Sequence, residues 1–209
     1  MATDLTFPPE EAALVRARYA RARVILEYGS GGSTMLAASM PGKYVMSVES
    51  DRNWAIDLQW KIDQADMSSP AVVWHVDIGA TGRWGRPVAD DGWQRYHHYP
   101  LSIWSEPFFR HPDTVLIDGR FRPACFVATA MRITRPVTVL FDDYVDRPAY
   151  HLVERFSAPR QKIGRMAMFE LEPVSVQPWM QDMLMELCTR RSLAADKVDY
   201  SVSVQSDRP

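Results

Sequence analysis

Short apolar runs alternate with amphipathic stretches along most of the chain. The runs are rich in β-branched residues and end at or beside an acidic residue, a pattern that predicts buried parallel strands. Between them, apolar positions recur at helical spacing. The predicted strands are residues 24–27, 44–48, 71–76, 114–117 and 136–141. The predicted helices are residues 8–21, 33–40, 51–65, 121–133 and 150–156. This alternation indicates an α/β protein built on a mostly parallel sheet.

Two parts of the chain depart from the alternation. Residues 160–164 and 166–172 read as two strands joined around Gly164, and a connection this short requires an antiparallel hairpin. Residues 78–112 form a long insertion whose aromatic content disfavours disorder. The insertion either walls off an active site or covers the core or a dimer contact. Its aromatic residues are Trp84, Trp93, Tyr96, Tyr99, Trp104, Phe108 and Phe109.

Composition limits the number of domains that the chain can form and the kinds of partner that it can bind. With 209 residues and 46% apolar content, the chain suits one α/β domain with a sizeable core. We expect an N-terminal helix within residues 1–22, the insertion at 78–112, and a C-terminal segment at 178–209. That last segment combines a docking or dimerising helix, 179–192, with a tail or short added edge, 196–209. The net charge of −2 and the scattered basic residues argue against a nucleic-acid groove.

Cysteine usage and the N-terminal residues indicate the compartment. Cys125 and Cys188 have neither the spacing nor the number for a disulfide framework or a zinc site. The first residues lack a basic start followed by an apolar core, and no apolar segment has the length needed to span a bilayer. We therefore expect a soluble, cytoplasmic protein with no membrane partner.

A glycine-rich loop follows the first predicted strand. Glu27 is expected as the last residue of that strand, facing the loop, and Gly29 and Gly31 allow a sharp turn close to a ligand. Ser33 or Thr34 can cap the next helix, whose free N–H groups face the same turn. Glu49 ends the second strand, 22 residues after Glu27, where a carboxylate accepts hydrogen bonds from ribose hydroxyls. The alternative is an ordinary strand-to-helix turn that binds nothing.

This stretch resembles the class I S-adenosylmethionine-dependent methyltransferases. The resemblance implies that the loop holds the methionyl part of the cofactor, that Glu49 binds the ribose and that Asp77, just past the third strand, meets the adenine. It also implies a Rossmann-like, mostly parallel seven-stranded sheet with helices on both faces and an antiparallel C-terminal hairpin. Dinucleotide-binding loops usually carry a third glycine where this chain has Thr34, so adenosylmethionine is favoured without excluding NAD(P). The implied methionyl contacts are Glu27, Gly29, Ser30, Gly31 and Ser33.

Three carboxylates follow the fourth and fifth predicted strands, Asp118 after one and Asp142 and Asp143 after the other. In the resembled fold they converge beside the donor methyl group, where like charges need a proton, a cation or a metal to offset them. One solution is Mg²⁺ held by Asp118 and Asp142, as in the catechol-type O-methyltransferases, which look similar here. That family has Asp-Asn where this chain has Asp142-Asp143, and a lysine base where this chain has Phe121.

The second solution uses nearby arginines. Arg120, Arg122 and Arg147 flank the acids in sequence and can form bidentate pairs with carboxylates or phosphates. They either neutralise the acids or orient an acidic substrate, which leaves Asp118 or Asp143 as a general base. Tyr144 either positions the substrate or packs.

The sequence predicts methyl transfer from S-adenosylmethionine to a hydroxyl or amine of a small molecule, with metal assistance left open. The Asn/Asp-Pro-Pro-Tyr/Phe tetrapeptide of enzymes that methylate amino groups on nucleic acid is replaced by Asp118-Gly-Arg-Phe. Whether the acceptor is anionic and whether the protein is a homodimer are also left open. Two rival hypotheses are an NAD(P)-dependent oxidoreductase and a non-catalytic methyltransferase-like binding protein.

Overall fold

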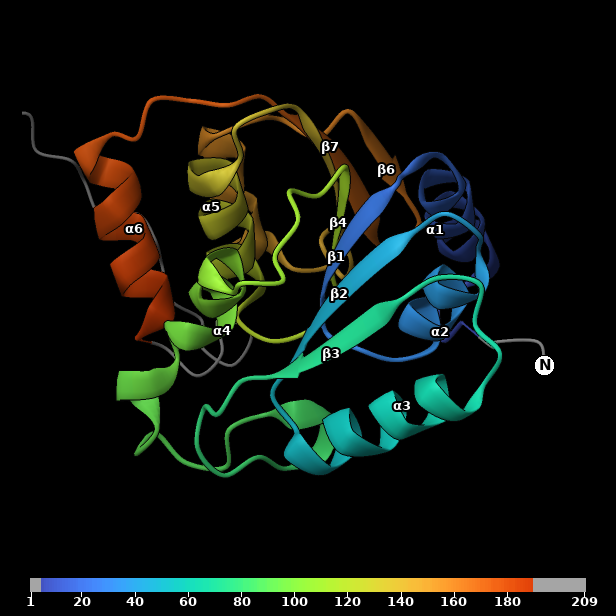
Figure 1. The fold of residues 1–209 in the computed structure, drawn as a ribbon. Helices are drawn as coiled ribbons and strands as arrows, with labels where there is room; N and C mark the ends of the chain where they lie inside the picture. The colour runs from blue at the N-terminus through green and yellow to red at the C-terminus, as the bar shows by residue number, and fades with distance from the viewer. Residues whose placement is uncertain (1–4, 190–209) are drawn as a thin grey trace, which may run out of the picture.

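Seven strands form one sheet with the order β3-β2-β1-β4-β5-β7-β6 (Figure 1). The computed structural model describes residues 5–189. Most of the strands carry continuous buried apolar runs, as expected where both faces of a sheet are covered. The strands are β1 (Val24–Tyr28), β2 (Tyr44–Glu49), β3 (Ala71–His75), β4 (Thr114–Ile117), β5 (Val137–Phe141), β6 (Gln161–Ile163) and β7 (Met166–Leu171).

Strands β1 to β5 are parallel, and β7 lies antiparallel between β5 and β6. This confirms the predicted Rossmann-like fold with a mostly parallel sheet and an antiparallel C-terminal hairpin. The strand order reverses at β1 and β4, and ligands of such sheets bind outside the carboxyl ends of the strands at this point. The fold therefore places a binding site beside the turns that follow β1 and β4.

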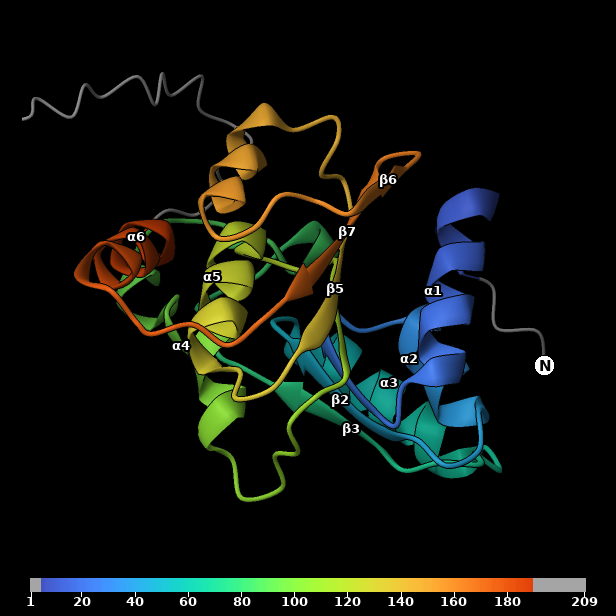
Figure 2. The same cartoon turned by 90° about the horizontal axis from the view of Figure 1, so that it is seen from above.

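Helices cover both faces of the sheet (Figure 2). On one face lie α1, α2 and α3. Val15 and Tyr19 of α1 and Leu58 of α3 share a core with Ile25 and Leu140 of the sheet. On the other, α5 and α6 share a larger core with the aromatic insertion. The α-helices are α1 (Pro9–Arg21), α2 (Gly32–Ser39), α3 (Arg52–Gln64), α4 (His98–Leu101), α5 (Arg122–Arg132) and α6 (Pro178–Cys188). The 3₁₀ helices are η1 (Arg83–Gly85), η2 (Trp93–Arg95), η3 (Ser102–Ser105) and η4 (Pro148–Arg155).

Two predicted helices differ from the observed ones. The segment expected as a helix at 150–156 is the 3₁₀ helix η4 and begins two residues earlier, at Pro148. The final helix begins at Pro178, and α6 ends at Cys188. The end of the predicted helix and the tail at 196–209 lie outside the described residues. Within the described part of the chain, no helix is long and apolar enough to cross a membrane.

The aromatic insertion is folded and contains η1, η2, α4 and η3. Tyr96 and Tyr99 are fully buried. The hydroxyl of Tyr28 donates to the carbonyl of Pro100 at 2.8 Å and accepts the indole N–H of Trp104 at 2.7 Å. The insertion therefore covers the core, as one of its two interpretations expected. It also reaches the carboxyl ends of the central strands, because the Tyr99 hydroxyl donates to the carbonyl of Val48.

Candidate functional site

The glycine loop joins β1 to α2 and packs directly on the turn after β4. Gly29 has φ 99°, and a Cβ there would lie 2.7 Å from the Cα of Gly119. Both features exclude other residues at position 29 without rearrangement. Gly31 is the N-cap residue of α2, and its N–H donates to the Thr34 hydroxyl at 3.0 Å. The two turns at the carboxyl ends of β1 and β4 thus form one backbone surface.

Glu27 lies beneath this loop, not at its surface. The expectation that Glu27 ends the strand and faces the loop is wrong, because β1 continues through Tyr28 and Glu27 is fully buried. Its carboxylate accepts the hydroxyl of Tyr19 at 2.6 Å and that of Thr34 at 2.5 Å. Burial raises the pKa of Glu27, and hydrogen bonds from Thr34 and Tyr19 oppose this rise. Glu27 thus fixes the Thr34 hydroxyl, which in turn accepts the N–H of Gly31.

Glu49 connects the glycine loop to the turn after β2. One carboxylate oxygen accepts the N–H and hydroxyl of Ser30, at 3.2 and 2.8 Å. The other accepts the N–H groups of Ser50 and Asp51, at 2.7 and 2.9 Å. The Ser50 hydroxyl donates to the carbonyl of Gly85, so the insertion borders the same place. Glu49 and Ser30 therefore lie together beside the glycine loop, and the ribose contact expected of Glu49 and the methionyl contact expected of Ser30 stay predictions.

The remaining predicted cofactor residues occupy the edges of this region. Ser33 is buried in the first turn of α2. Asp77, which follows β3, accepts the N–H of Gly79 at 2.9 Å and pairs with Arg95 of η2 at the surface. The Gly79 N–H and the Arg95 guanidinium lower the pKa of Asp77. The adenine contact expected of Asp77 stays a prediction.

Asp118, Asp142 and Asp143 meet beyond the carboxyl ends of β4 and β5, where the sequence placed them. Arg122, at the start of α5, lies between them. Its guanidinium is 3.0 Å from Asp118 and 3.0 Å from Asp143. It also donates to the main-chain carbonyl of Asp142 at 2.7 Å. Arg122 thereby ties the turn after β4 to the turn after β5.

Arg165 completes this cluster and was not predicted. Its guanidinium binds both carboxylate oxygens of Asp142, at 2.9 and 3.0 Å, and lies 3.3 Å from Asp143. Arg147 pairs with Asp143 at 2.7 Å. Arg165 comes from the turn of the β6–β7 hairpin, far along the chain from the acids. The signal that could have found it is the antiparallel pairing of β7 with β5, which brings a basic hairpin turn beside the acidic turn.

The cluster does not fit a magnesium site. Three carboxylates face three guanidinium groups, and Asp142 is 1% exposed with both oxygens bonded to Arg165. Mg²⁺ takes an octahedral shell of oxygen ligands that usually includes several waters, whereas both oxygens of Asp142 are already bonded to the cationic guanidinium of Arg165. Within residues 5–189, no group of three His, Cys, Asp or Glu side chains is arranged to hold a metal ion. Asp118 and Asp142 serve as ion-pair partners, so the structure adopts the arginine solution.

Asp118 differs from the other two acids. Its side chain is 32% exposed, and Arg122 is its one ion-pair partner among the described residues. Burial by the surrounding protein, with the neighbouring Asp142 and Asp143, raises the pKa of Asp118 to about 7, against the attraction of Arg122. A carboxyl group with such a pKa can accept a proton near neutral pH. Asp143 instead contacts three guanidinium groups.

The last two predicted substrate residues have different surroundings. Tyr144 is fully buried, and its hydroxyl donates to Glu154 at 2.6 Å, which corresponds to the packing alternative. Arg120 lies two residues beyond Asp118, and its backbone N–H donates to the Tyr99 hydroxyl at 3.3 Å. Of the three arginines named from the sequence, Arg122 and Arg147 neutralise acids.

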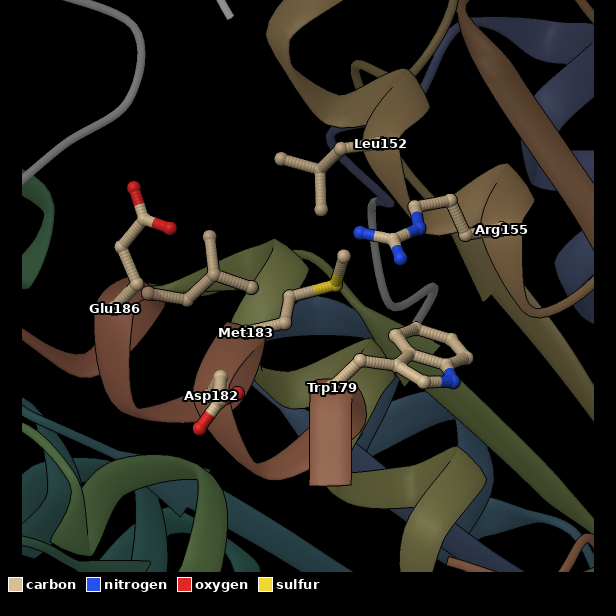
Figure 3. A pocket seen from close by; sticks show the side chains of 7 residues that line it. Leu152, Arg155, Trp179, Asp182, Met183 and Glu186 are labelled. Atoms are coloured by element: carbon tan, nitrogen blue, oxygen red, sulfur yellow. The ribbon is translucent and has the colours of Figure 1, made fainter. Parts of the chain in front are cut away.

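A separate cavity of about 410 Å³ lies between η4 and α6 (Figure 3). Arg155 of η4 stacks over the ring of Trp179 of α6, 4.4 Å from the ring centroid. All the predicted site residues lie among those the structure describes, and none of them lines this cavity. Its lining residues are Leu152, Arg155, Trp179, Asp182, Met183, Glu186 and Leu187.

Three solved structures resemble this chain. A methyltransferase-like protein from Silicibacter pomeroyi is 50% identical, with a TM-score of 0.85 over 89% of this chain and 97% of its own. The O-methyltransferase from Bacillus cereus, in complex with SAH, is 20% identical, with a TM-score of 0.52 over 82% and 84% of the two chains. A cofactor-bound protein from MTB is 16% identical, with a TM-score of 0.50 over 80% and 82%. No protein-family model and no curated protein matches the chain.

Proposed function

This chain belongs to the class I S-adenosylmethionine-dependent methyltransferase superfamily, and from that membership we propose that it transfers a methyl group from S-adenosylmethionine to a hydroxyl or amine of a small molecule. The observation that carries the proposal is the joint position of the glycine loop and Glu49. They meet at the carboxyl edge of β1 and β2, beside the reversal of strand order, where such sheets bind their ligands.

The glycine loop supplies the features that an adenosylmethionine site needs. Gly29 and Gly31 leave the backbone free of side chains, and the first N–H groups of α2 face the loop and favour a negatively charged group such as the methionyl carboxylate. Glu49 supplies a carboxylate for the ribose hydroxyls. Adenosylmethionine bound here would have its sulfonium beside the turn that carries Asp118, because Gly119 packs on Gly29.

The reaction proposed is an in-line displacement. A lone pair of the acceptor oxygen or nitrogen forms a bond to the methyl carbon, and the bond from carbon to the sulfonium sulfur breaks. The sulfur keeps that electron pair, and the product is neutral at sulfur. Asp118 takes the proton that the acceptor loses, and Arg122 holds Asp118 in place. Alignment of the two reactants supplies most of the rate enhancement in such a transfer.

The arginine cluster takes the place of a metal in this proposal. Arg122, Arg147 and Arg165 neutralise the acids that a divalent ion would otherwise offset. We therefore propose a metal-independent reaction, in contrast to the catechol-type enzymes.

Calorimetric titration with S-adenosylhomocysteine tests the cofactor site. We expect the wild-type protein to bind it, and Glu49→Gln to bind it about tenfold more weakly, because hydrogen bonds to a charged acceptor are lost. Glu10→Ala, an exposed acid of α1, is the control and should bind as the wild type does. Binding of NADH without binding of S-adenosylhomocysteine would instead establish the oxidoreductase hypothesis.

A screen for turnover separates an active enzyme from a methyltransferase-like binding protein. The protein is incubated with methyl-labelled S-adenosylmethionine and a panel of small hydroxyl and amino compounds, and label in the products is counted. Transfer to one class of compound supports the proposal. Cofactor binding without transfer across the panel would favour the non-catalytic hypothesis.

A further inference from the structure

Of the arginines on the turns that carry or flank the three acids, Arg120 alone has no acidic partner among the described residues. Arg122, Arg147 and Arg165 each lie within 3.0 Å of an aspartate oxygen. No carboxylate of the described residues lies within ion-pair distance of Arg120, and its Nε is shielded from solvent without a hydrogen-bond partner. Among the residues that the structure describes, Nε of Arg120 is the single buried side-chain nitrogen or oxygen in that condition. A buried donor of this kind is costly, and such groups are common where a ligand binds.

The surroundings of Arg120 increase its attraction for an anion. Burial lowers the pKa of Arg120, and the positive charges of Arg122 and Arg86 lower it further. Arg86 comes from the insertion and is exposed. Tyr99 of the insertion accepts the Arg120 backbone N–H with its hydroxyl, and Tyr99 and Tyr150 of η4 both influence the pKa of Arg120. Positive charge therefore gathers around Arg120, and an incoming oxyanion would relieve the charge repulsion and accept a hydrogen bond from Nε.

We propose that Arg120 binds an acidic group of the methyl acceptor, a carboxylate or a phosphate, and so restricts the enzyme to anionic acceptors. This inference rests on the proposed function. The planar guanidinium can bind two oxygens of such a group at once. Arg120 follows Asp118 by two residues, so the group that it holds lies close to the proposed general base.

The position of Arg120 favours the acceptor over the cofactor. The cofactor is expected over Gly29 and Gly31 and beside Glu49, on the side of β1 and β2. Arg120 lies in the turn between β4 and α5, and the groups that influence its pKa include residues of the insertion and of η4. The backbone of Gly119 packs on that of Gly29, so the turn that carries Arg120 borders the glycine loop on the β4 side.

Titration of the purified full-length protein with small aromatic acids tests the inference. Benzoate and phenyl phosphate are the two anionic probes, and benzyl alcohol is the neutral one. Each is titrated into the free protein and into the protein saturated with S-adenosylhomocysteine. Arg120→Gln removes the charge, and Arg132→Gln is the matched control, because Arg132 is an exposed arginine at the far end of α5, the helix that follows Arg120. Thermal unfolding of both variants verifies that they are folded.

We expect at least one anionic probe to bind the wild type and Arg132→Gln equally. Arg120→Gln should bind that probe about 10- to 100-fold more weakly, as expected for loss of a hydrogen-bonded charge pair, and should bind S-adenosylhomocysteine unchanged. Comparison of benzoate with phenyl phosphate then tells whether the site prefers a carboxylate or a phosphate. Benzyl alcohol should show no dependence on Arg120.

Three results would overturn the inference. The first is equal binding of the anions by the wild type and Arg120→Gln, and the second is the absence of anion binding by the wild type at millimolar concentrations. The third is weaker binding of S-adenosylhomocysteine by Arg120→Gln together with unchanged binding of 5′-methylthioadenosine, which lacks the carboxylate. That result would assign Arg120 to the cofactor. If the wild type bound no S-adenosylhomocysteine but bound anions through Arg120, the anion site would stand and the proposed function would fail.

Discussion

Replacement of Thr34 by valine tests how the glycine loop is held in place. Thr34 is fully buried, and its hydroxyl makes two short hydrogen bonds beside a longer one of 3.5 Å to Ser47. It donates to Glu27 at 2.5 Å and accepts the N–H of Gly31 at 3.0 Å. Valine keeps the shape of threonine but removes both hydrogen bonds. Thr34→Val therefore leaves a buried carboxylate with fewer donors and the N-cap N–H of α2 without an acceptor.

The size of the effect follows from these two losses. Each buried group that loses its partner costs about 1–3 kcal/mol, and Tyr19 still donates to Glu27, so we expect a total of about 2–4 kcal/mol. Thr129→Val is the matched control. Thr129 is equally buried, but its hydroxyl donates to the carbonyl of Cys125 inside its own helix α5 and caps no loop, so its loss should cost about 1 kcal/mol or less.

The penalty of Thr34→Val should also depend on pH. Burial already raises the pKa of Glu27, and the Thr34 hydrogen bond is the largest contribution that lowers it. The variant therefore raises this pKa further. A raised carboxyl pKa favours the folded state at low pH and disfavours it as the group ionises, so the penalty should be smaller at acidic pH than at neutral pH.

Urea denaturation followed by circular dichroism measures both effects. The midpoint should fall for Thr34→Val, with an unchanged slope, and move little for Thr129→Val. S-adenosylhomocysteine binding should weaken only in the first variant, because the loop loses its support. Equal stability losses in the two variants would refute the view that Thr34 holds the loop.

Further predictions concern the acid cluster. Asp118→Asn should bind S-adenosylhomocysteine like the wild type but lose methyl transfer, and wild-type kcat/KM should fall as pH drops below about 7, since Asp118 must be ionised to accept a proton. Unchanged turnover in Asp118→Asn would exclude it as the base. Arg165→Met should lower the free energy of unfolding by about 2–3 kcal/mol in urea titrations, because buried Asp142 loses its bidentate partner while Arg122 remains. A loss below about 0.5 kcal/mol would show that the pair contributes little. Incubation with EDTA should leave methyl transfer unchanged, and a loss restored by Mg²⁺ would reinstate a metal.

The parallel strands were predictable because a strand that is buried on both faces consists of consecutive apolar residues. The predicted and observed bounds of β4 agree at both ends, Thr114 and Ile117. The end of β1 was missed by one residue, since Tyr28 reads as the start of a loop. Its backbone pairs with Val48 of β2 and Ile117 of β4, and its hydroxyl is bonded from the insertion, so its partners lie in distant parts of the chain. Local patterns carry no information about such partners.

The site was predictable in its position and less so in its contacts. The rule that ligands bind at the carboxyl ends of parallel strands brought the three acids together correctly. The arginines that neutralise these acids depend on contacts between distant parts of the chain. Arg165 reaches Asp142 because β7 of the hairpin pairs with β5. The role of Glu27 was misplaced for a similar reason, because its partner Tyr19 belongs to α1, which the loop motif does not include.

The most direct test of the account is a crystal structure of the protein with S-adenosylhomocysteine bound. We predict the homocysteine part along Gly29 and Gly31, the ribose hydroxyls within hydrogen-bond distance of the Glu49 carboxylate, and the sulfur facing the side of the site that carries Asp118. Density for the ligand elsewhere, with no contact to the glycine loop or Glu49, would contradict the proposed cofactor site and the mechanism built on it.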